Sequence, residues 1–443
     1  MLFSNRDLKR LVLPLICEQL LAVTVGMADT VMVSHVGEAA VSGVALVDAL
    51  AILVVQVFAA LCTGGTVVVS QWLGRKDKEA ANIAAAQLLQ ITTLIALLLM
   101  LLTLVFRRFL LSHIFGVLEA DVMAACNTYF WITALSLPFL AIYNAGAALL
   151  RSVGATSPSL AISFIMNLIN IVGNGILIYA FDFGVAGAAF STLISRAVAA
   201  MLILVLLFRA NSPFFLRGKI PSAFKPEVLR SILSIGVPSG LENGMFQIGK
   251  LLIQRLLVSF GTIAIAANAV AGNIACIATL PGSAFSLALL TVVGRCMGAN
   301  LPEEAARNTK KLLSASYLSM FACNAAVFFL LQPIASVFAL SAQTTALVMV
   351  LMRWHCLFAA LLWTPAFCLP SALRGAGDVK YTMKISIFSM WIFRILGSYF
   401  FSIVLGLGVV GVWFAIFSDW LFRSVLFFLR FIKGKWKNIQ VLQ

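Results

Sequence analysis

Two acidic residues interrupt the first apolar stretch of the chain, residues 8–34. Glu18 and Asp29 lie eleven positions apart there, and Asp29 belongs to the segment GMADTVMVSHVG. In a helix this spacing leaves the two carboxylates within about 20° of one face and about 16 Å apart along the axis. Ionisable groups at membrane depth face the protein interior or a water-filled cavity, so we expect both to line one inner surface. Pro14 removes a backbone donor upstream and is a hinge candidate.

A second group of polar side chains falls in the predicted fifth helix. Asn167, Asn170 and Asn174 follow one another at spacings of three and four, which stacks them on one helical face. Thr192 adds a hydroxyl from the next predicted helix. Together with Asp29, Asn170 and Asn174, it offers oxygen ligands that suit Na⁺ or a site that holds a titratable proton. Alternatively, these residues only satisfy one another as hydrogen bonds between helices, and the pattern favours neither interpretation.

The predicted seventh helix has a polar stripe of its own, which includes a lysine. Asn243, Gln247 and Lys250 belong to this stripe, and Glu242 lies at its edge. Together with Glu18 of the first helix, these residues are candidates for lining a cavity or binding substrate. Lys250 has three potential partners, namely Glu242, Asp48 or a ligand, and an unpaired lysine in a cavity would argue against a purely cationic substrate. Arg394 and Asp419 in the last two helices are expected to form a structural pair, because buried charges need partners.

No motif for catalysis or nucleotide binding is visible in the sequence. GxGxxG and Walker patterns are absent, and the three histidines are too dispersed to form a site. Eight scattered cysteines without a CxxC spacing predict neither a zinc site nor a disulfide framework. We therefore expect no enzyme activity and no cofactor, apart from Na⁺ as a potential coupling ion at Asp29. The energy for any transport would come from an ion gradient.

The amino-acid composition indicates the class of protein in which these polar residues lie. Of 443 residues, 62% are hydrophobic and only 11% are charged, and the mean hydropathy is +1.05. A bilayer core about 30 Å thick takes roughly 20 apolar residues per helix. Lipid cannot satisfy open backbone groups, and the alternation typical of membrane barrels is absent. The sequence therefore predicts an all-α polytopic membrane protein.

The positive charges predict the topology of this bundle. The net charge is +15, and 23 of the 31 Lys and Arg residues fall on loops that a twelve-helix arrangement places on one side. This asymmetry follows the positive-inside rule and puts both termini in the cytoplasm. The basic character therefore reports topology and contact with anionic membrane lipid, and we expect no nucleic-acid partner.

The sequence contains an internal repeat that relates its two halves. At a shift of 224 residues, Pro14 matches Pro238 and Glu18 matches Glu242. The expected organisation is an N-lobe (1–208), a basic cytoplasmic linker (209–230) and a C-lobe (231–443), related by a pseudo-twofold axis along the membrane normal. Two six-helix lobes suit alternating access around a central site, and a duplicated scaffold without transport is the alternative. The twelve predicted spans are 8–34, 44–72, 82–106, 122–150, 159–180, 184–208, 229–258, 268–293, 310–338, 344–373, 381–403 and 408–432.

Several segments together resemble the multidrug and toxic compound extrusion (MATE) family. They are ADTVMVSHVG, VSQWLGRKD, ALLRSVGATSPSL, NIVGNGILIYAFDFGVAGAA, PGSAFSLALLTVVGRCMGAN and LPSALRGAGDVKYTM. The resemblance implies a first-lobe cation site at Asp29, Asn170, Asn174 and Thr192. Some archaeal and DinF-type members carry Asp where Asn174 stands, so the choice between Na⁺ and H⁺ stays open. NorM-type members also use an acidic residue in the seventh helix. Glu242 lies in that helix here, but closer to the proline than we would expect for this residue.

The resemblance implies a cation-coupled antiporter, using Na⁺ or H⁺, that exports small amphipathic drugs or toxic metabolites. It also implies a multi-pass protein of the bacterial inner membrane, and we expect it to act as a monomer. A flippase for lipid-linked precursors is the alternative, because related exporters share such lobes. An enzyme embedded in the membrane is a further alternative, which the absence of a catalytic cluster disfavours.

Overall fold

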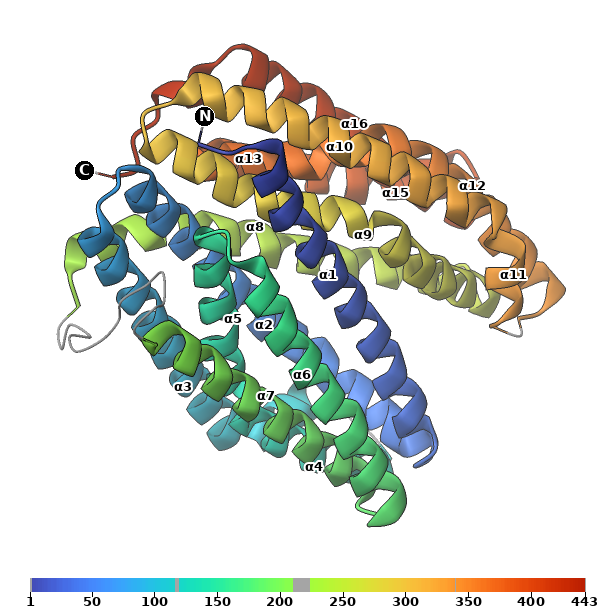
Figure 1. The fold of residues 1–443 in the computed structure, drawn as a ribbon. Coiled ribbons are helices and arrows are strands. Elements are labelled where there is room, and N and C mark those ends of the chain that lie inside the picture. Colours follow the sequence, from blue (N-terminus) through green and yellow to red (C-terminus); the bar gives the residue numbers. More distant parts are fainter. Residues whose placement is uncertain (1, 116–118, 210–223, 339, 443) are drawn as a thin grey trace. The chain divides into compact units, whose positions relative to one another are not determined.

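The computed structural model describes residues 2–115, 119–209, 224–338 and 340–442. All regular secondary structure in these ranges is helical (Figure 1). Ten helices there are long and apolar enough to cross a membrane, and a bent helix pair makes an eleventh span. Helix α8 (Pro226–Val258), at the place of the expected seventh span, is not among these apolar helices; it has 33 residues and carries the polar stripe of Asn243, Gln247 and Lys250. The chain is thus an all-α polytopic membrane protein.

The chain divides into two compact units. The N-unit is Cys17–Val237, and the C-unit is Met1–Ile16 together with Pro238–Gln443. This division differs from the expected lobes 1–208 and 231–443, because the first residues of α1 pack in the C-unit and those of α8 pack in the N-unit. Of the expected linker, residues 210–223 lie outside the described ranges.

The prolines of the two long helices lie next to this division. Helix α1 (Asn5–Ser34) is continuous through Pro14, and α8 is continuous through Pro238. The boundary between the units falls two residues after Pro14 and directly before Pro238. A proline interrupts the backbone hydrogen bonds of its helix at that point. The hinge role of Pro14 stays a prediction.

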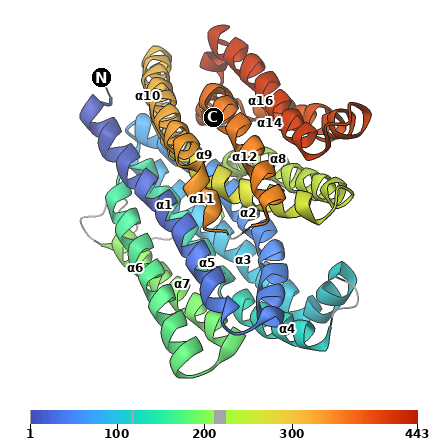
Figure 2. The same ribbon diagram turned by 90° about the vertical axis from the view of Figure 1, so that its right-hand side faces the viewer.

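The N-unit contains the middle part of the chain. Helices α6 and α7 run side by side in both views (Figures 1 and 2). A buried apolar cluster that includes Val47, Ile132 and Ala189 forms its core. Besides the second half of α1 and the first turns of α8, its elements are α2 (Glu38–Gly74), α3 (Lys78–Phe115), α4 (Ala120–Leu135), α5 (Leu137–Ser152), α6 (Thr156–Asn174), the π-helical η1 (Gly175–Ala180) and α7 (Gly184–Phe208).

The C-unit has a larger apolar core that is rich in aromatic rings. Phe358 stacks on Phe417 with ring centroids 4.6 Å apart, and His355 is buried between Trp413 and Trp420. Besides the first turns of α1 and most of α8, its elements are α9 (Thr262–Gly298), α10 (Pro302–Phe329), α11 (Leu331–Ser336), α12 (Ala342–Phe358), η2 (Ala359–Cys368), α13 (Leu369–Gly375), α14 (Val379–Ser389), η3 (Met390–Leu396), α15 (Gly397–Tyr399), η4 (Phe400–Val404), α16 (Gly408–Ile432) and the short η5 (Lys435–Asn438).

The predicted span 122–150 is two helices rather than one. Helices α4 and α5 meet at a 48° bend. Pro138 lies in the first turn of α5 and cannot donate a backbone hydrogen bond to α4. The Ser136 hydroxyl at the break donates instead to the carbonyl of Thr133 at 2.6 Å. The expected span 122–150 is thus present as one span with a bend, which the boundaries alone did not anticipate.

Equivalent glycines begin the second helix of each repeat. Gly37 precedes α2 with φ +131°, and Gly261 precedes α9 with φ +86°. L-residues with a side chain rarely adopt these angles, whereas glycine does so without a steric penalty. The two positions are separated by 224 residues in the sequence. The repeat therefore extends to the geometry of the turns.

Candidate functional site

Asp29 lies within hydrogen-bonding distance of two asparagines of α6. The Nδ2 group of Asn174 donates to Oδ1 of Asp29 at 2.7 Å. The carboxamide of Asn170 lies between Asp29 and Thr192; with its nitrogen toward Asp29, the orientation that pairs a donor with the carboxylate, it is 2.7 and 3.2 Å from Oδ1 and Oδ2. Asn170 and Asn174 are buried, while Asp29 and Thr192 are half-buried. The four residues predicted to form a cation site therefore lie together.

The close packing of α6 and α7 positions these side chains. A Cβ atom on Gly173 would lie 2.4 Å from the Ser191 hydroxyl, so a larger residue there would displace this hydroxyl. Ser191 also donates to the backbone carbonyl of Asn170 at 2.7 Å, and this bond ties α7 to the turn that carries the site. The wider π-helical turn of η1 begins directly after Asn174. Such turns are frequent at functional sites.

Three further polar residues lie near Asp29, and we did not predict their role. Asp48 and Arg196 are close enough to act electrostatically on the Asp29 carboxylate. The hydroxyl of Tyr129 lies 3.5 Å from Oδ1 of Asp48, and Arg196 donates to the Ser136 hydroxyl at 2.7 Å. The location of a tyrosine and an arginine inside predicted spans is the signal that would have drawn attention to them.

Both glutamates that we took as cavity candidates form ion pairs. Glu18 lies 3.6 Å from Nη1 of Arg151 within the N-unit, and Glu242 lies 2.6 Å from Nη2 of Arg374 within the C-unit. The two arginines also correspond in the repeat, where LRSVG matches LRGAG. The structure therefore repeats one contact in each half. The first pair attaches the part of α1 after Pro14 to the N-unit, and the second attaches the part of α8 after Pro238 to the C-unit.

The remaining polar residues of α8 differ in their surroundings. Lys250 is exposed, and its ammonium group lies 5.2 Å from the centre of the Phe246 ring. Within the described ranges Lys250 has no carboxylate partner; Glu242, one of its three potential partners, is paired with Arg374 instead. Asn243 and Gln247 are half-buried, and their side chains make no hydrogen bond to another described residue.

The expected pair of Arg394 and Asp419 is confirmed as part of a larger cluster. Oδ2 of Asp419 lies 2.7 Å from Nη2 of Arg394, and Oδ1 lies 2.7 Å from Nε of Arg423. The guanidinium of Arg394 also lies 4.8 Å from the centre of the Phe246 ring. Two arginines thus share one carboxylate, and Lys250 lies near the same ring. The interior of the C-unit has an excess of positive charge at this place.

Eleven apolar spans in the described ranges and the more polar helix α8, built as two repeats with charged groups inside each, define a polytopic membrane protein of the transporter class. A model of the MatE family matches the chain twice, over residues 14–176 and 238–400. The chain belongs to this family, whose members are transporters and not enzymes. Both ends of the second match are displaced by 224 residues from those of the first. This confirms the internal repeat and its spacing.

Individual relatives agree with this assignment along the whole chain. A probable multidrug resistance protein NorM of Thermotoga maritima is 27% identical, over 99% of this chain and 94% of its own length. The uncharacterized transporter YisQ of Bacillus subtilis is 26% identical, over 96% of this chain and 93% of its own. A solved MOP superfamily transporter from Pyrococcus furiosus has the same fold, with a TM-score of 0.92 and 20% identity over 98% and 96% of the two chains.

Proposed function

We propose that this protein is a cation-coupled antiporter that exports small amphipathic drugs or toxic metabolites by alternating access. The observation that carries the proposal is the environment of Asp29. Glu18, Glu242 and Asp419 are each paired with arginine, whereas Asp29 is bonded to neutral carboxamides. A carboxylate with neutral partners gains or loses a proton or a cation without leaving a buried arginine unpaired. Asp29 is therefore the acid best suited to couple an ion to transport.

The surroundings of Asp29 are compatible with either H⁺ or Na⁺. The amide nitrogen of Asn174 donates to the carboxylate, and this hydrogen bond suits an ionised Asp29 that can accept a proton. The Oδ1 atom of Asn174 is buried without a hydrogen-bond partner among the described residues. Turning this amide would present an oxygen next to Asp29, and oxygen is the ligand that hard cations prefer. Na⁺ and H⁺ are thus the two ions to compare.

The substrate class follows from relatives and from Lys250. Several relatives are named as multidrug resistance or multidrug export proteins, among them MepA of Staphylococcus aureus. The unpaired Lys250, next to the cluster of Arg394, Arg423 and Asp419, favours amphipathic substrates that carry an anionic group. A zwitterionic amphiphile and its methyl ester, which lacks the anionic group, are therefore suitable test substrates.

The cellular setting is proposed on the same grounds. The positive-inside asymmetry places both termini in the cytoplasm, and the relatives from Thermotoga maritima and Bacillus subtilis are bacterial. We propose the bacterial inner membrane as the location. Each compact unit has an apolar core of its own, and we propose that a monomer is the working form.

The decisive experiment measures efflux under separately imposed ion gradients. Purified protein is reconstituted into vesicles that are loaded with a fluorescent amphipathic substrate. We expect either an inward Na⁺ gradient or an inward H⁺ gradient, each at zero membrane potential, to accelerate export several-fold over vesicles without a gradient. The same export rate under both gradients and under none would contradict a coupled antiporter. Empty vesicles are the control for leakage.

Replacing Lys250 with glutamine is expected to reduce transport of anionic substrates selectively. A hydrogen bond to a charged group contributes about 1.5–3 kcal/mol, so the apparent affinity for a zwitterionic amphiphile should fall roughly tenfold or more. The methyl ester of the same compound lacks the anionic group and should be transported as before. Competition binding to purified protein measures both, and Lys250→Arg, which keeps the charge, should retain most of the affinity. Equal losses for the acid and its ester would refute the proposed role of Lys250.

A further inference from the structure

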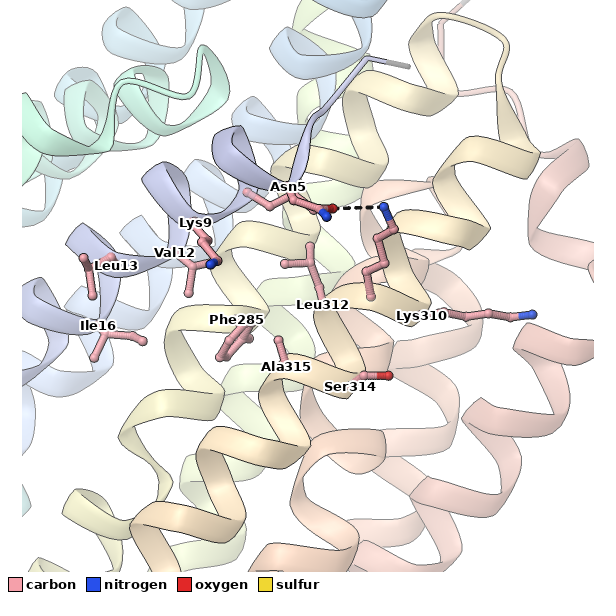
Figure 3. A pocket seen from close by; sticks show the side chains of 12 residues that line it. Asn5, Lys9, Val12, Leu13, Ile16, Phe285, Lys310, Leu312, Ser314 and Ala315 are labelled. Atoms are coloured by element: carbon pink, nitrogen blue, oxygen red, sulfur yellow. Dashed lines mark hydrogen bonds between the residues drawn. The ribbon is translucent and has the colours of Figure 1, made fainter.

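A cavity within the C-unit lies between the first turns of α1 and helix α10. Its volume is about 710 Å³, which falls within the range of about 300–1,000 Å³ that is typical of ligand sites. Figure 3 shows side chains from α1, from α10 and from α9 around it, the last of these being Phe285. No residue of the candidate ion-coupling or substrate sites lines this cavity. It is therefore separate from the candidate transport site.

The lining has two chemically different ends. Val12, Ile16, Phe285 and Ala315 form an apolar part in which Val12 is 7% and Phe285 4% exposed. At the other end, Lys311 donates through Nζ to Oδ1 of Asn5 at 3.0 Å (dashed line in Figure 3). A cavity with an apolar wall and a polar end is complementary to an amphipathic ligand.

The charge of the polar end is positive and is not neutralised. Lys9 and Lys311 are exposed, and neither has a carboxylate partner among the described residues. A third lysine, Lys310, also lines the cavity, but its ammonium group points away from Lys9 in Figure 3. By contrast, Lys437 near the C-terminus is paired with Glu303 at 2.7 Å. Both lysines are therefore available to an anion that comes from outside the chain.

We propose that this cavity binds an anionic phospholipid. The phosphate group lies between Lys9 and Lys311, and an acyl chain follows Val12 and Ile16 toward Phe285. Lysine-containing pockets between membrane helices on the cytoplasmic side bind anionic head groups in this way. The positive-inside asymmetry puts Lys9 and Lys311 on that side. An acyl chain is the occupant that fits the apolar end.

A second cavity of about 630 Å³ shows why the charge matters to this choice. It lies between the second half of α1 and α6 and is lined by Leu20, Leu160 and Phe164 among others. Its lining contains no charged side chain, so nothing there selects an anionic ligand. The lipid proposal thus depends on the lysines as well as on the apolar wall, and it does not rest on the proposed transport function.

Native mass spectrometry of the purified protein tests the proposal. Phosphatidylglycerol and phosphatidylcholine with identical acyl chains are titrated against the wild type. We expect one phosphatidylglycerol to bind at least tenfold more tightly than phosphatidylcholine. Lys9→Gln with Lys311→Gln should weaken this binding about tenfold or more, because each lysine near a membrane surface contributes to the attraction of anionic lipid. The matched control is Lys380→Gln with Lys384→Gln, which removes two exposed lysines of α14 outside the cavity.

Two further arms distinguish a lipid site from a general attraction between lysine and phosphate. Ala315→Trp fills the apolar end without a change of charge and should also weaken binding of phosphatidylglycerol about tenfold. Glycerol 3-phosphate carries the phosphate without acyl chains and should not compete. The proposal is overturned if the double variant of Lys9 and Lys311 and the control double variant of α14 lose binding equally. It is also overturned if Ala315→Trp binds like the wild type, or if glycerol 3-phosphate displaces the lipid. Equal affinity of the wild type for both lipids would overturn it as well.

Discussion

Asp29→Asn is expected to abolish the acceleration of export by an ion gradient. Asparagine has nearly the same shape as aspartate and still accepts the hydrogen bond from Asn174, but it carries no charge that a proton or Na⁺ could neutralise. In inverted vesicles, export driven by the preferred ion should fall several-fold, to about the rate without a gradient. Binding of substrate to the purified variant should stay within about twofold of the wild type, because the fold and Lys250 are unchanged.

Two matched variants show whether Asp29 alone has this role. Asp121→Asn makes the same chemical change at an exposed position of α4 and should leave coupling intact. Asp48→Asn changes the neighbouring carboxylate that accepts from Tyr129. If Asp48→Asn abolishes coupling while Asp29→Asn retains it, the coupling residue is Asp48 and our assignment is wrong. Thr192→Val removes a hydroxyl next to Asn170 and should reduce the coupled rate without abolishing it.

The second large effect is expected for stability, at Asp419. This side chain is fully buried, and its carboxylate lies 2.7 Å from both Arg394 and Arg423. Asp419→Asn leaves two buried guanidinium groups without a counter-charge, and removing one partner of a buried ion pair costs about 3–5 kcal/mol. Folded proteins are stable by only about 5–15 kcal/mol. We therefore expect a large fall in the midpoint of thermal unfolding in detergent and a low yield of monodisperse protein.

Replacing all three members of this cluster distinguishes charge from packing. Buried ion networks exchanged for apolar residues of similar size are often neutral in stability. The triple variant Asp419→Leu, Arg394→Met and Arg423→Met should therefore recover most of the loss. Asp121→Asn is again the matched single change and should shift stability by less than about 0.5 kcal/mol. An unfolding midpoint of Asp419→Asn equal to that of the wild type would show that the cluster is not important for the fold.

Much of the architecture was predictable because hydropathy and repetition are strong signals in a membrane chain. All twelve predicted spans overlap helices of the structure, with ends that differ by several residues, as for 82–106 and α3 (Lys78–Phe115). Asp29, Asn170, Asn174 and Thr192 could be grouped because polar residues are rare in these segments and because helical periodicity determines which of them share a face. The break before Pro138 was also readable, and we overlooked it.

The partners of the buried charges were decided by the tertiary structure. Glu242 and Arg374 are 132 positions apart, and no local spacing relates a glutamate of one helix to an arginine of another. The same holds for Glu18 with Arg151, and for the two arginines that share Asp419. The sequence by itself determined the spans, the repeat and the acidic residues inside them, because these depend on residue type and local periodicity. Only helix packing decided which carboxylates are paired with arginine and that Asp29 has carboxamide partners, because that depends on distances between side chains far apart in the chain.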